Sequence, residues 1–398
     1  MKSGWRIGAL FGIPIRIAPS WFIVLAVVTY AYGNNWLMMD WNPTVSWIAA
    51  FAMSISLFVS VLLHELGHSL VARSQHIPVQ SITLFMFGGV ANISQESHTP
   101  GQAFQVAIAG PAVSFALFIV LALVDLVLPH ASPGGTVVAN LAGLNLLLAL
   151  FNMIPGLPLD GGQVLKATLW KLTGSRLAGV RWAARAGWLL GATAIALSVY
   201  GVIRYGMISL LWITLIGWFG MRHASAHQKF ADLQQLLLRL TVSHAMTRNF
   251  VVLDHHCTVG EFHQQFPLGD RPSVIVTANH HPEGIVALET VLACPSDTWD
   301  QPIHAIAQPL ESRLMLTEDV SLAAAIDQLE QSSIPWLVVK SPTGAIAGVL
   351  DRGDMVRTIA NALKQPIAED VVQRIKTDHA YPDRLPLIAI AQTARIGI

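Results

Sequence analysis

Long apolar runs are the feature that most restricts how this chain can fold. They lie in the first part of the sequence, at roughly residues 20–38, 46–72, 102–129, 137–153, 184–203 and 205–221. Most are long enough to cross about 30 Å of hydrocarbon as a helix. The chain is 53% hydrophobic and 12% charged, which is too apolar for an ordinary soluble protein. We therefore expect an α-helical multi-pass membrane domain with about six spans in a lipid bilayer.

Acidic residues divide the chain into two parts. Residues 1–222 hold only five of the 24 Asp and Glu residues, and the remaining 176 residues hold the other 19. A polar domain is therefore expected after residue 222. The zero net charge gives no indication of a nucleic-acid partner. Cys257 and Cys294 have no CxxC spacing, which argues against a disulfide framework or a cysteine metal site.

Lys and Arg positions predict the orientation in the membrane. The start of the chain lacks a compact apolar core and a small-residue cleavage site, so the first span is expected to be retained. An inside N-terminus leaves only Arg204 on the outer side. The residues then on the cytoplasmic side are Lys2, Arg6, Arg16, Arg73, Lys166, Lys171, Arg176, Arg181, Arg185 and Arg222. Six spans would return the C-terminus to the cytosol, so both termini of this cell-membrane protein are expected there.

The HELGH segment at residues 64–68 carries metal and acid–base chemistry. His64 and His68 are four residues apart, so they share one helix face and can bind one Zn²⁺. The Glu65 carboxylate between them can take a proton from the attacking water and pass it to the leaving amine. The alternative is a helix end with interfacial histidines, although such residues in an apolar span are costly unless they are paired or functional.

Asp160 is the predicted third metal ligand. A catalytic zinc usually has three protein ligands, and Asp160 is the only acidic residue after Asp125 in the membrane part. The preceding Pro-rich segment makes a continued helix unfavourable, and the two following glycines allow a sharp turn. The orientation argument places Asp160 on the same side as HELGH. The alternative role for Asp160 is an N-cap for the next helix.

These motifs resemble the site-2 protease family of intramembrane zinc metalloproteases (peptidase M50-like). HELGH is followed about 90 residues later by Asn152, Pro155 and the Asp160-Gly pair, and AIAGPAVSF resembles the family's AGP segment. The resemblance implies one Zn²⁺ per chain held by His64, His68 and Asp160, with Glu65 as catalytic acid and base. It also implies that Asn152 stabilises the oxyanion. From the residues alone, Asn152 could equally bond a neighbouring helix, whereas Asn145 is expected to be structural.

Gly88 and Gly89 lie in LFMFGGVANI, which resembles the family's Gly-rich membrane-associated strand. An exposed strand edge here could bind substrate by strand addition. A substrate helix must unwind before its peptide bond is accessible, and strand addition would meet that need. A buried apolar hairpin with its turn at the glycines is the alternative.

Two similar segments follow a helical linker. HAM at 244–246 parallels HAI at 304–306, and GIVALETV at 284–291 parallels GVLDRGDM at 348–355. They resemble a cytosolic α/β pair of CBS domains, which often bind adenosine nucleotides. Asp354 matches the family's ribose-binding Asp, but Asp351 replaces the expected Ser or Thr. A nucleotide site and a purely structural or dimerising pair both remain open.

The predicted domains fill the whole chain. Their ranges are 1–222 for the membrane domain, 223–241 for the linker, 242–298 and 299–364 for the CBS-like repeats, and 365–398 for a tail. The tail shows one predicted helix, IAEDVVQRIK, and no interpretable motif. The histidine doublets at 255–256 and 280–281 lie in polar turns and are expected to lack a nearby carboxylate set, so we expect solvated loops rather than a second metal site.

Together these features predict an enzyme that hydrolyses a peptide bond within or near a transmembrane helix of a single-span membrane protein. The CBS-like pair is expected to regulate access by shifting an equilibrium between arrangements of the spans, and it provides a surface for a homodimer. The alternatives are a CBS-regulated transporter or channel, whose intramembrane His, Glu and Asp bind an ion, and an inactive protease-like scaffold.

Overall fold

The chain forms two compact units, one up to Ala231 and one from Asp232 onward. The boundary lies inside the predicted linker. The computed structural model describes residues 4–86, 88–93, 95–129, 132–265, 273–278, 281–286, 290–291, 294–295, 298–310, 314–332, 335–381 and 387–395. Each unit is treated separately below.

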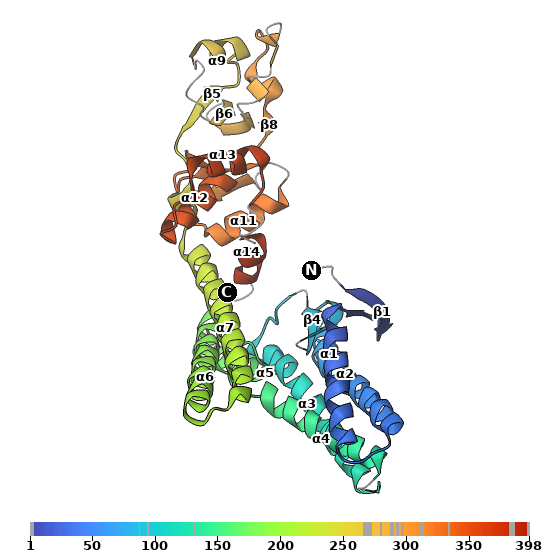
Figure 1. Ribbon diagram of the computed structural model, residues 1–398. Coiled ribbons are helices and arrows are strands. Elements are labelled where there is room, and N and C mark those ends of the chain that lie inside the picture. The colour runs from blue at the N-terminus through green and yellow to red at the C-terminus, as the bar shows by residue number, and fades with distance from the viewer. Residues whose placement is uncertain are drawn as a thin grey trace. The chain divides into compact units, whose positions relative to one another are not determined.

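The membrane unit is mainly helical (Figure 1). Its helices are α1 (Ser20–Leu37), α2 (Pro43–Ser74), α3 (Pro100–Asp125), α4 (Pro133–Asn152), α5 (Asp160–Thr173), α6 (Arg176–Tyr205) and the beginning of α7 (Leu211–Arg239). Helix α1 packs on α2, and α3 packs against α2, α4 and α5. Helix α3 therefore lies at the centre of the group that surrounds the HELGH segment.

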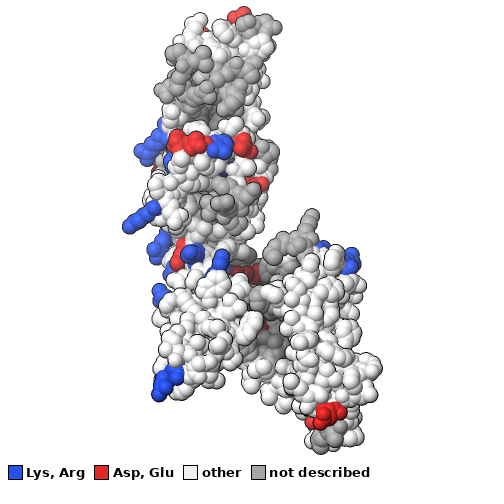
Figure 2. Space-filling view, in the orientation of Figure 1, with Lys and Arg blue, Asp and Glu red and all other residues white. Residues whose placement is uncertain are grey.

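Four of these described helices are long and apolar enough to cross a membrane, namely α2, α3, α4 and α6. Their outward side chains are apolar, as at Val120 of α3 and Leu197 of α6, which are 56% and 65% exposed. Figure 2 shows few charged side chains on the visible surface of this unit. The multi-pass helical prediction is confirmed. The two remaining predicted spans correspond to α1 and the first half of α7, and the count of six stays a prediction.

The starts of the long helices follow from local side-chain chemistry. The Asn42 side chain accepts the Thr44 N–H at 3.0 Å where α2 begins. Thr99 and Gln102 form a reciprocal capping box at the start of α3. Helices α2, α3 and α4 each have a proline in the first turn, where no intrahelical N–H is needed.

A four-stranded sheet lies beside the helices. Its strands are β1 (Trp5–Leu10), β2 (Ile13–Ile17), β3 (Val79–Phe85) and β4 (Gly88–Ile93). They are ordered β1-β2-β3-β4, with β2 parallel to β3 and the other pairs antiparallel. Ile13 and Ile82 of the sheet pack with Leu66 of α2 in one buried cluster. The sheet therefore rests on the helix that carries HELGH, and β4 is an edge strand.

The C-terminal unit contains two similar α/β repeats. The first comprises β5 (Phe250–Asp254), α9 (Val259–Gln265), β6 (Ser273–Ala278) and β7 (His281–Val286), with β8 (Gln308–Pro309) at its edge. The second comprises β9 (Met315–Thr317), α11 (Leu322–Gln331), β10 (Trp336–Lys340), β11 (Ile346–Asp351) and α12 (Arg352–Ala362). In each repeat the first strand pairs parallel with the second, which pairs antiparallel with the third. This agreement confirms the predicted internal repeat.

The tail contributes to the core of the second repeat. Its predicted helix is present as α13 (Glu369–Asp378), and a further helix, α14 (Leu387–Arg395), follows. Leu387 and Ile390 of α14 are buried in the same cluster as Leu237, near the end of α7. The tail is therefore part of the folded C-terminal unit, although its sequence shows no recognisable motif.

Candidate metal centre

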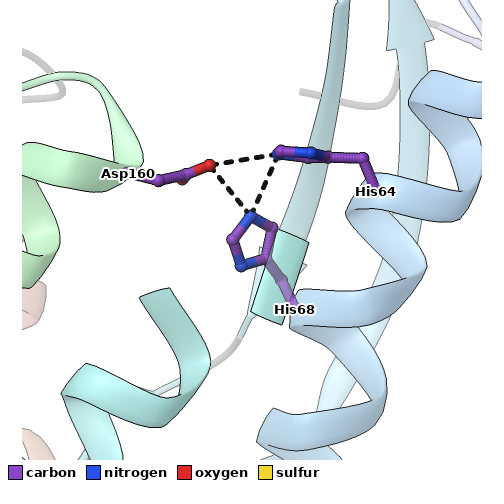
Figure 3. A group of neighbouring side chains, drawn as sticks. All are labelled: His64, His68 and Asp160. Atoms are coloured by element: carbon purple, nitrogen blue, oxygen red, sulfur yellow. Dashed lines mark hydrogen bonds and ion pairs between the residues drawn. The ribbon is translucent and has the colours of Figure 1, made fainter. Parts of the chain in front are cut away.

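Helix α2 and the start of α5 bring His64, His68 and Asp160 together (Figure 3). The Asp160 Oδ2 atom lies 3.0 Å from His64 Nε2 and 3.3 Å from His68 Nε2. The two Nε2 atoms are 3.3 Å apart. Both histidines are buried, and the Asp160 side chain is 20% exposed. Asp160 follows His64 by 96 positions and His68 by 92, yet the three side chains converge on one point.

The three donor atoms match the requirements of zinc. With bonds of about 2.0–2.1 Å to nitrogen or oxygen, tetrahedral geometry places neighbouring donors about 3.3 Å apart, close to the three separations in this cluster. Two imidazoles and one carboxylate are also a donor set that zinc prefers. The residues present therefore fit one zinc ion.

Helix α3 orients both imidazoles from behind. His64 Nδ1 lies 2.9 Å from the hydroxyl of buried Ser114, and His68 Nδ1 lies 2.6 Å from the Val106 carbonyl. The Val106 carbonyl can only accept, so His68 Nδ1 carries the proton and its Nε2 lone pair faces the other donors. Such outer partners fix the ring orientation of metal-binding histidines.

Gly110 of α3 leaves room for the two imidazoles. A Cβ atom at this position would lie 2.7 Å from His64 Nε2 and closer still to His68 Nε2. Any side chain at residue 110 would therefore displace a donor nitrogen. The sequence contains Gly110 within the AGP segment, but its steric role becomes visible only when α2 and α3 are placed together.

Asp160 is positioned by the close approach of its flanking backbone. It is the first residue of α5, and Leu159 precedes it as the N-cap without a side-chain hydrogen bond. A Cβ atom on Gly161 would lie within 2.5 Å of the Ile154 carbonyl oxygen. The start of α5 thus packs directly on the chain that follows α4. The Asp160 carboxylate bonds the two imidazoles. The alternative role of Asp160 as the N-cap of this helix is not what the structure has.

Glu65 lies between the helix and the edge strand. Its Oε2 atom accepts the Ala91 N–H of β4 at 3.2 Å. A Cβ atom on Gly89 would lie 3.2 Å from Glu65 Oε1 and closer to the rest of the side chain. Gly88 has φ = 130°, a conformation that favours glycine. None of the described side chains of β4 is buried, in contrast to the alternative of a buried hairpin.

The two asparagines of α4 have different surroundings. Asn145 is fully buried, and its Nδ2 donates to Ser60 Oγ at 3.0 Å and to the Leu141 carbonyl. Asn152 is the last residue of α4, is partly exposed and donates to the Leu148 carbonyl at 3.1 Å. Asn145 thus links α4 to α2, as expected of a structural residue. The oxyanion role of Asn152 stays a prediction.

Sequence reasoning missed an ion cluster that holds the segment after β4. Glu96 bonds Arg176 of α6, whose side chain is only 2% exposed, and lies 3.7 Å from Lys166 Nζ of α5. Burial alone would raise the pKa of Glu96, but Lys166 and Arg176 together lower it below its usual range. The cluster ties the chain beyond β4 to the helix that begins with Asp160. Its only sequence clue is the scarcity of acidic residues in this unit.

Asp354 in the second repeat is held by side chains of the chain itself. Its Oδ1 atom lies 2.8 Å from Lys376 Nζ and 3.4 Å from Arg357 Nη1. Burial, together with the nearby Asp351 carboxylate, raises the pKa of Asp354 to about 6. Asp351 accepts the Asp354 N–H at 2.9 Å and caps α12. Nucleotide binding at Asp354 stays a prediction.

Comparison with known proteins identifies the family of the membrane unit. Residues 52–131 and 131–190 match Peptidase family M50, and these segments include HELGH and Asp160. A protein of Synechocystis sp. whose name assigns it to the zinc metalloproteases is 37% identical over 364 residues, covering 90% of this chain and 96% of the relative.

Two solved structures each match part of the chain. The site-2 protease from Methanocaldococcus jannaschii is 31% identical and covers 56% of this chain and 95% of its own, with a TM-score of 0.40. CBSX2 in complex with AMP is 23% identical and covers 31% of this chain and 98% of its own, with a TM-score of 0.26. The near full-length relative and the family match at the segments that carry all three donors show that this chain belongs to peptidase family M50 and is a zinc metalloprotease of the site-2 protease type.

Proposed function

We propose that the enzyme hydrolyses a peptide bond within or near the transmembrane helix of a single-span membrane protein, with zinc held by His64, His68 and Asp160. The observation that carries this proposal is the convergence of the three donors at separations of 3.0–3.3 Å. Two of them lie on α2, a helix long and apolar enough to cross a membrane. A metal peptidase site on such a helix can reach substrate that is embedded in the bilayer.

Each polar residue of the site has a distinct role in this proposal. A zinc ion held by His64, His68 and Asp160 would supply Lewis-acid chemistry to the scissile carbonyl and to the attacking water. Glu65 takes the proton from that water and delivers it to the leaving amine. Asn152 donates to the oxyanion that develops, after its amide turns away from the Leu148 carbonyl that it now bonds.

The free edge of β4 is the proposed binding site for an unwound substrate segment. The Ala91 N–H donates to Glu65 rather than to β3, so it faces away from β3. Alternation along an antiparallel strand points the Gly89 backbone groups the same way. A substrate strand that pairs with Gly89 and Ala91 would take over the Ala91 N–H and lie directly beside Glu65. Strand pairing would also compensate the hydrogen bonds lost when the substrate helix unwinds.

We extend the proposal to regulation by the C-terminal unit. A nucleotide whose ribose bonds Asp354 would share this carboxylate with the Lys376 ammonium, which lies 2.8 Å from its Oδ1 atom. Nucleotide binding and the packing of α13 would therefore be coupled, and the unit could signal through α7, to whose end it is joined. The same unit would provide the surface for a homodimer. A nucleotide-dependent cleavage rate that Asp354→Asn abolishes would support this regulation, and a rate independent of nucleotide would contradict it.

The proposed topology has six spans with both termini in the cytoplasm. It rests on the basic residues at the expected inner ends of the spans and on the four apolar helices α2, α3, α4 and α6. Labelling of single cysteines introduced near each terminus in intact cells would test it. Labelling by a membrane-impermeant reagent from outside would contradict it.

The decisive experiment compares purified wild type with Glu65→Gln. We measure bound zinc and follow cleavage of a single-span substrate in lipid vesicles. A protease of this kind binds one zinc per chain at the catalytic site in both proteins and loses cleavage in the variant, because glutamine cannot accept the proton. Stoichiometric zinc with no cleavage by either protein would favour a scaffold. Absence of zinc together with ion flux would favour a transporter.

A further inference from the structure

A second group of metal-binding side chains lies in the first repeat of the C-terminal unit. Asp254 ends β5, and His255 and His256 form the turn that follows. One donor atom from each of the three residues lies within 4.8 Å of the others. The expectation that this doublet lacks nearby carboxylates was wrong, because Asp254 directly precedes it in the chain and the fold brings Glu283 to it. Of the other doublet, residue 280 lies outside the described residues, as does the side chain of residue 281.

The two imidazoles face each other through their Nε2 atoms, which are 2.8 Å apart. At this distance one nitrogen must donate a proton to the lone pair of the other. A divalent transition-metal ion can replace that shared proton. Tetrahedral coordination with bonds of about 2.0–2.1 Å needs the nitrogens about 3.3 Å apart, so the pair would open by about half an ångström. His256 is exposed and can make this movement.

Neighbouring groups lie close to both the imidazole and the backbone of His255. Glu283 Oε2 on β7 lies 3.7 Å from His255 Nδ1, which favours a proton on Nδ1 and leaves the Nε2 lone pair available. The carbonyl of His255 accepts a hydrogen bond from His304 Nδ1 at 3.0 Å. A carboxylate behind a ligating imidazole is the usual outer partner in metal sites. Three separate segments, around β5, β7 and residue 304, thus converge on this turn.

We propose that Asp254, His255 and His256 bind a divalent transition-metal ion such as Zn²⁺, at a site separate from the catalytic zinc. Two imidazoles and a carboxylate suit zinc and disfavour Mg²⁺, which prefers oxygen ligands. The exposed side completes its coordination with water. Neither the peptidase reaction nor a nucleotide at Asp354 uses these residues, so this site is independent of the proposed function.

Metal binding would cross-link the β5–α9 turn of the first repeat. An ion that binds the folded repeat and not its open form lowers the population of the open form. The reduction is in proportion to the ratio of the free ion concentration to the dissociation constant. At a free zinc concentration of 100 times that constant, we expect about hundredfold greater protection of the backbone amides in β5 and α9 from hydrogen exchange.

The test uses the full-length protein in detergent, stripped with a chelator and titrated with zinc alone. We expect about two zinc ions per chain in the wild type and about one in the double variant His255→Asn/His256→Asn, with asparagine chosen because it suits turns. His379→Asn is the matched control. His379 is exposed and has φ = 51°, which asparagine tolerates, so this variant should still bind about two.

Three readouts decide the outcome. The double variant should retain wild-type peptidase activity, which shows that the protein is folded, and should lose the zinc-dependent protection of β5 and α9. Saturation of the wild type at one zinc per chain would overturn the proposal. So would a double variant that still binds two zinc ions, or zinc-dependent protection that persists without the two histidines.

Discussion

Gly110→Ala is the substitution whose effect follows most directly from the geometry of the metal centre. The added Cβ atom would lie 2.7 Å from His64 Nε2 and closer to His68 Nε2, where a normal contact is about 3.5 Å. If α3 keeps its place, both imidazoles must therefore move, that of His64 by about 0.8 Å and that of His68 by more. Donor distances to zinc tolerate only about 0.2 Å, and a 1 Å misplacement can cost about 10²-fold in rate. We expect loss of most of the catalytic zinc and at least a hundredfold loss of cleavage.

Gly143→Ala is the matched control. Gly143 lies inside α4, and a Cβ atom there would have nothing within 4 Å. The same chemical change should leave zinc and cleavage intact and, by helix propensity, stabilise the protein by up to about 1 kcal/mol. Metal analysis and cleavage of a single-span substrate in vesicles would measure both variants. Wild-type zinc and activity in Gly110→Ala would refute the packing argument.

Three further substitutions test other parts of the account. Glu96→Gln should destabilise the protein by about 1–3 kcal/mol at pH 7, between the values for exposed and buried ion pairs, since the Glu96 side chain is 39% exposed and that of Arg176 only 2%. Folding lowers the pKa of Glu96, so its negative charge stabilises the folded protein at pH values above the unfolded pKa of about 4.3. The difference in stability between Glu96→Gln and the wild type should vanish as the pH falls through the folded pKa. Thermal unfolding in detergent at several pH values would measure this, and a constant difference would contradict it. Asn152→Ala should lower kcat by about 10²–10³-fold with zinc retained, whereas the buried Asn145→Ala should cost about 1–2 kcal/mol of stability and leave kcat of the folded enzyme unchanged. Equal kcat losses in both would argue against a specific role for Asn152. Gly89→Ala places a methyl group against Glu65 and should reduce cleavage without loss of zinc, and unchanged cleavage would count against the close packing of β4 on α2.

The helical membrane unit and the internal repeat could be predicted because both depend on local patterns. Apolar runs of helical length appear in the sequence itself, and the strand–helix order recurs about 60 residues later. The two strands before the first span could not be predicted in this way. Strand β1 has no buried described residue and β2 is only five residues long, so the pairing of β2 with β3, more than 60 residues away, has no local signature.

The chemistry of the metal centre could be predicted, but its supports could not. His64 and His68 are fixed by a four-residue spacing, and Asp160 was singled out because acidic residues are scarce. The roles of Ser114, Gly110 and Arg176 depend on which helix faces meet, and that information is not contained in any short stretch of sequence. The same reason explains the Asp254 and His255 cluster, whose second carboxylate comes from β7.

The zinc content of Asp160→Asn tests the central claim most directly. Asparagine keeps the size of the side chain and removes the charge that lies 3.0 Å from His64 Nε2 and 3.3 Å from His68 Nε2. Asp125→Asn, at the end of α3, is the control for loss of an acidic residue from the same unit. If Asp160 is the third ligand, its variant loses the catalytic zinc and cleavage while the control keeps both. Full zinc and wild-type cleavage in Asp160→Asn would contradict the account.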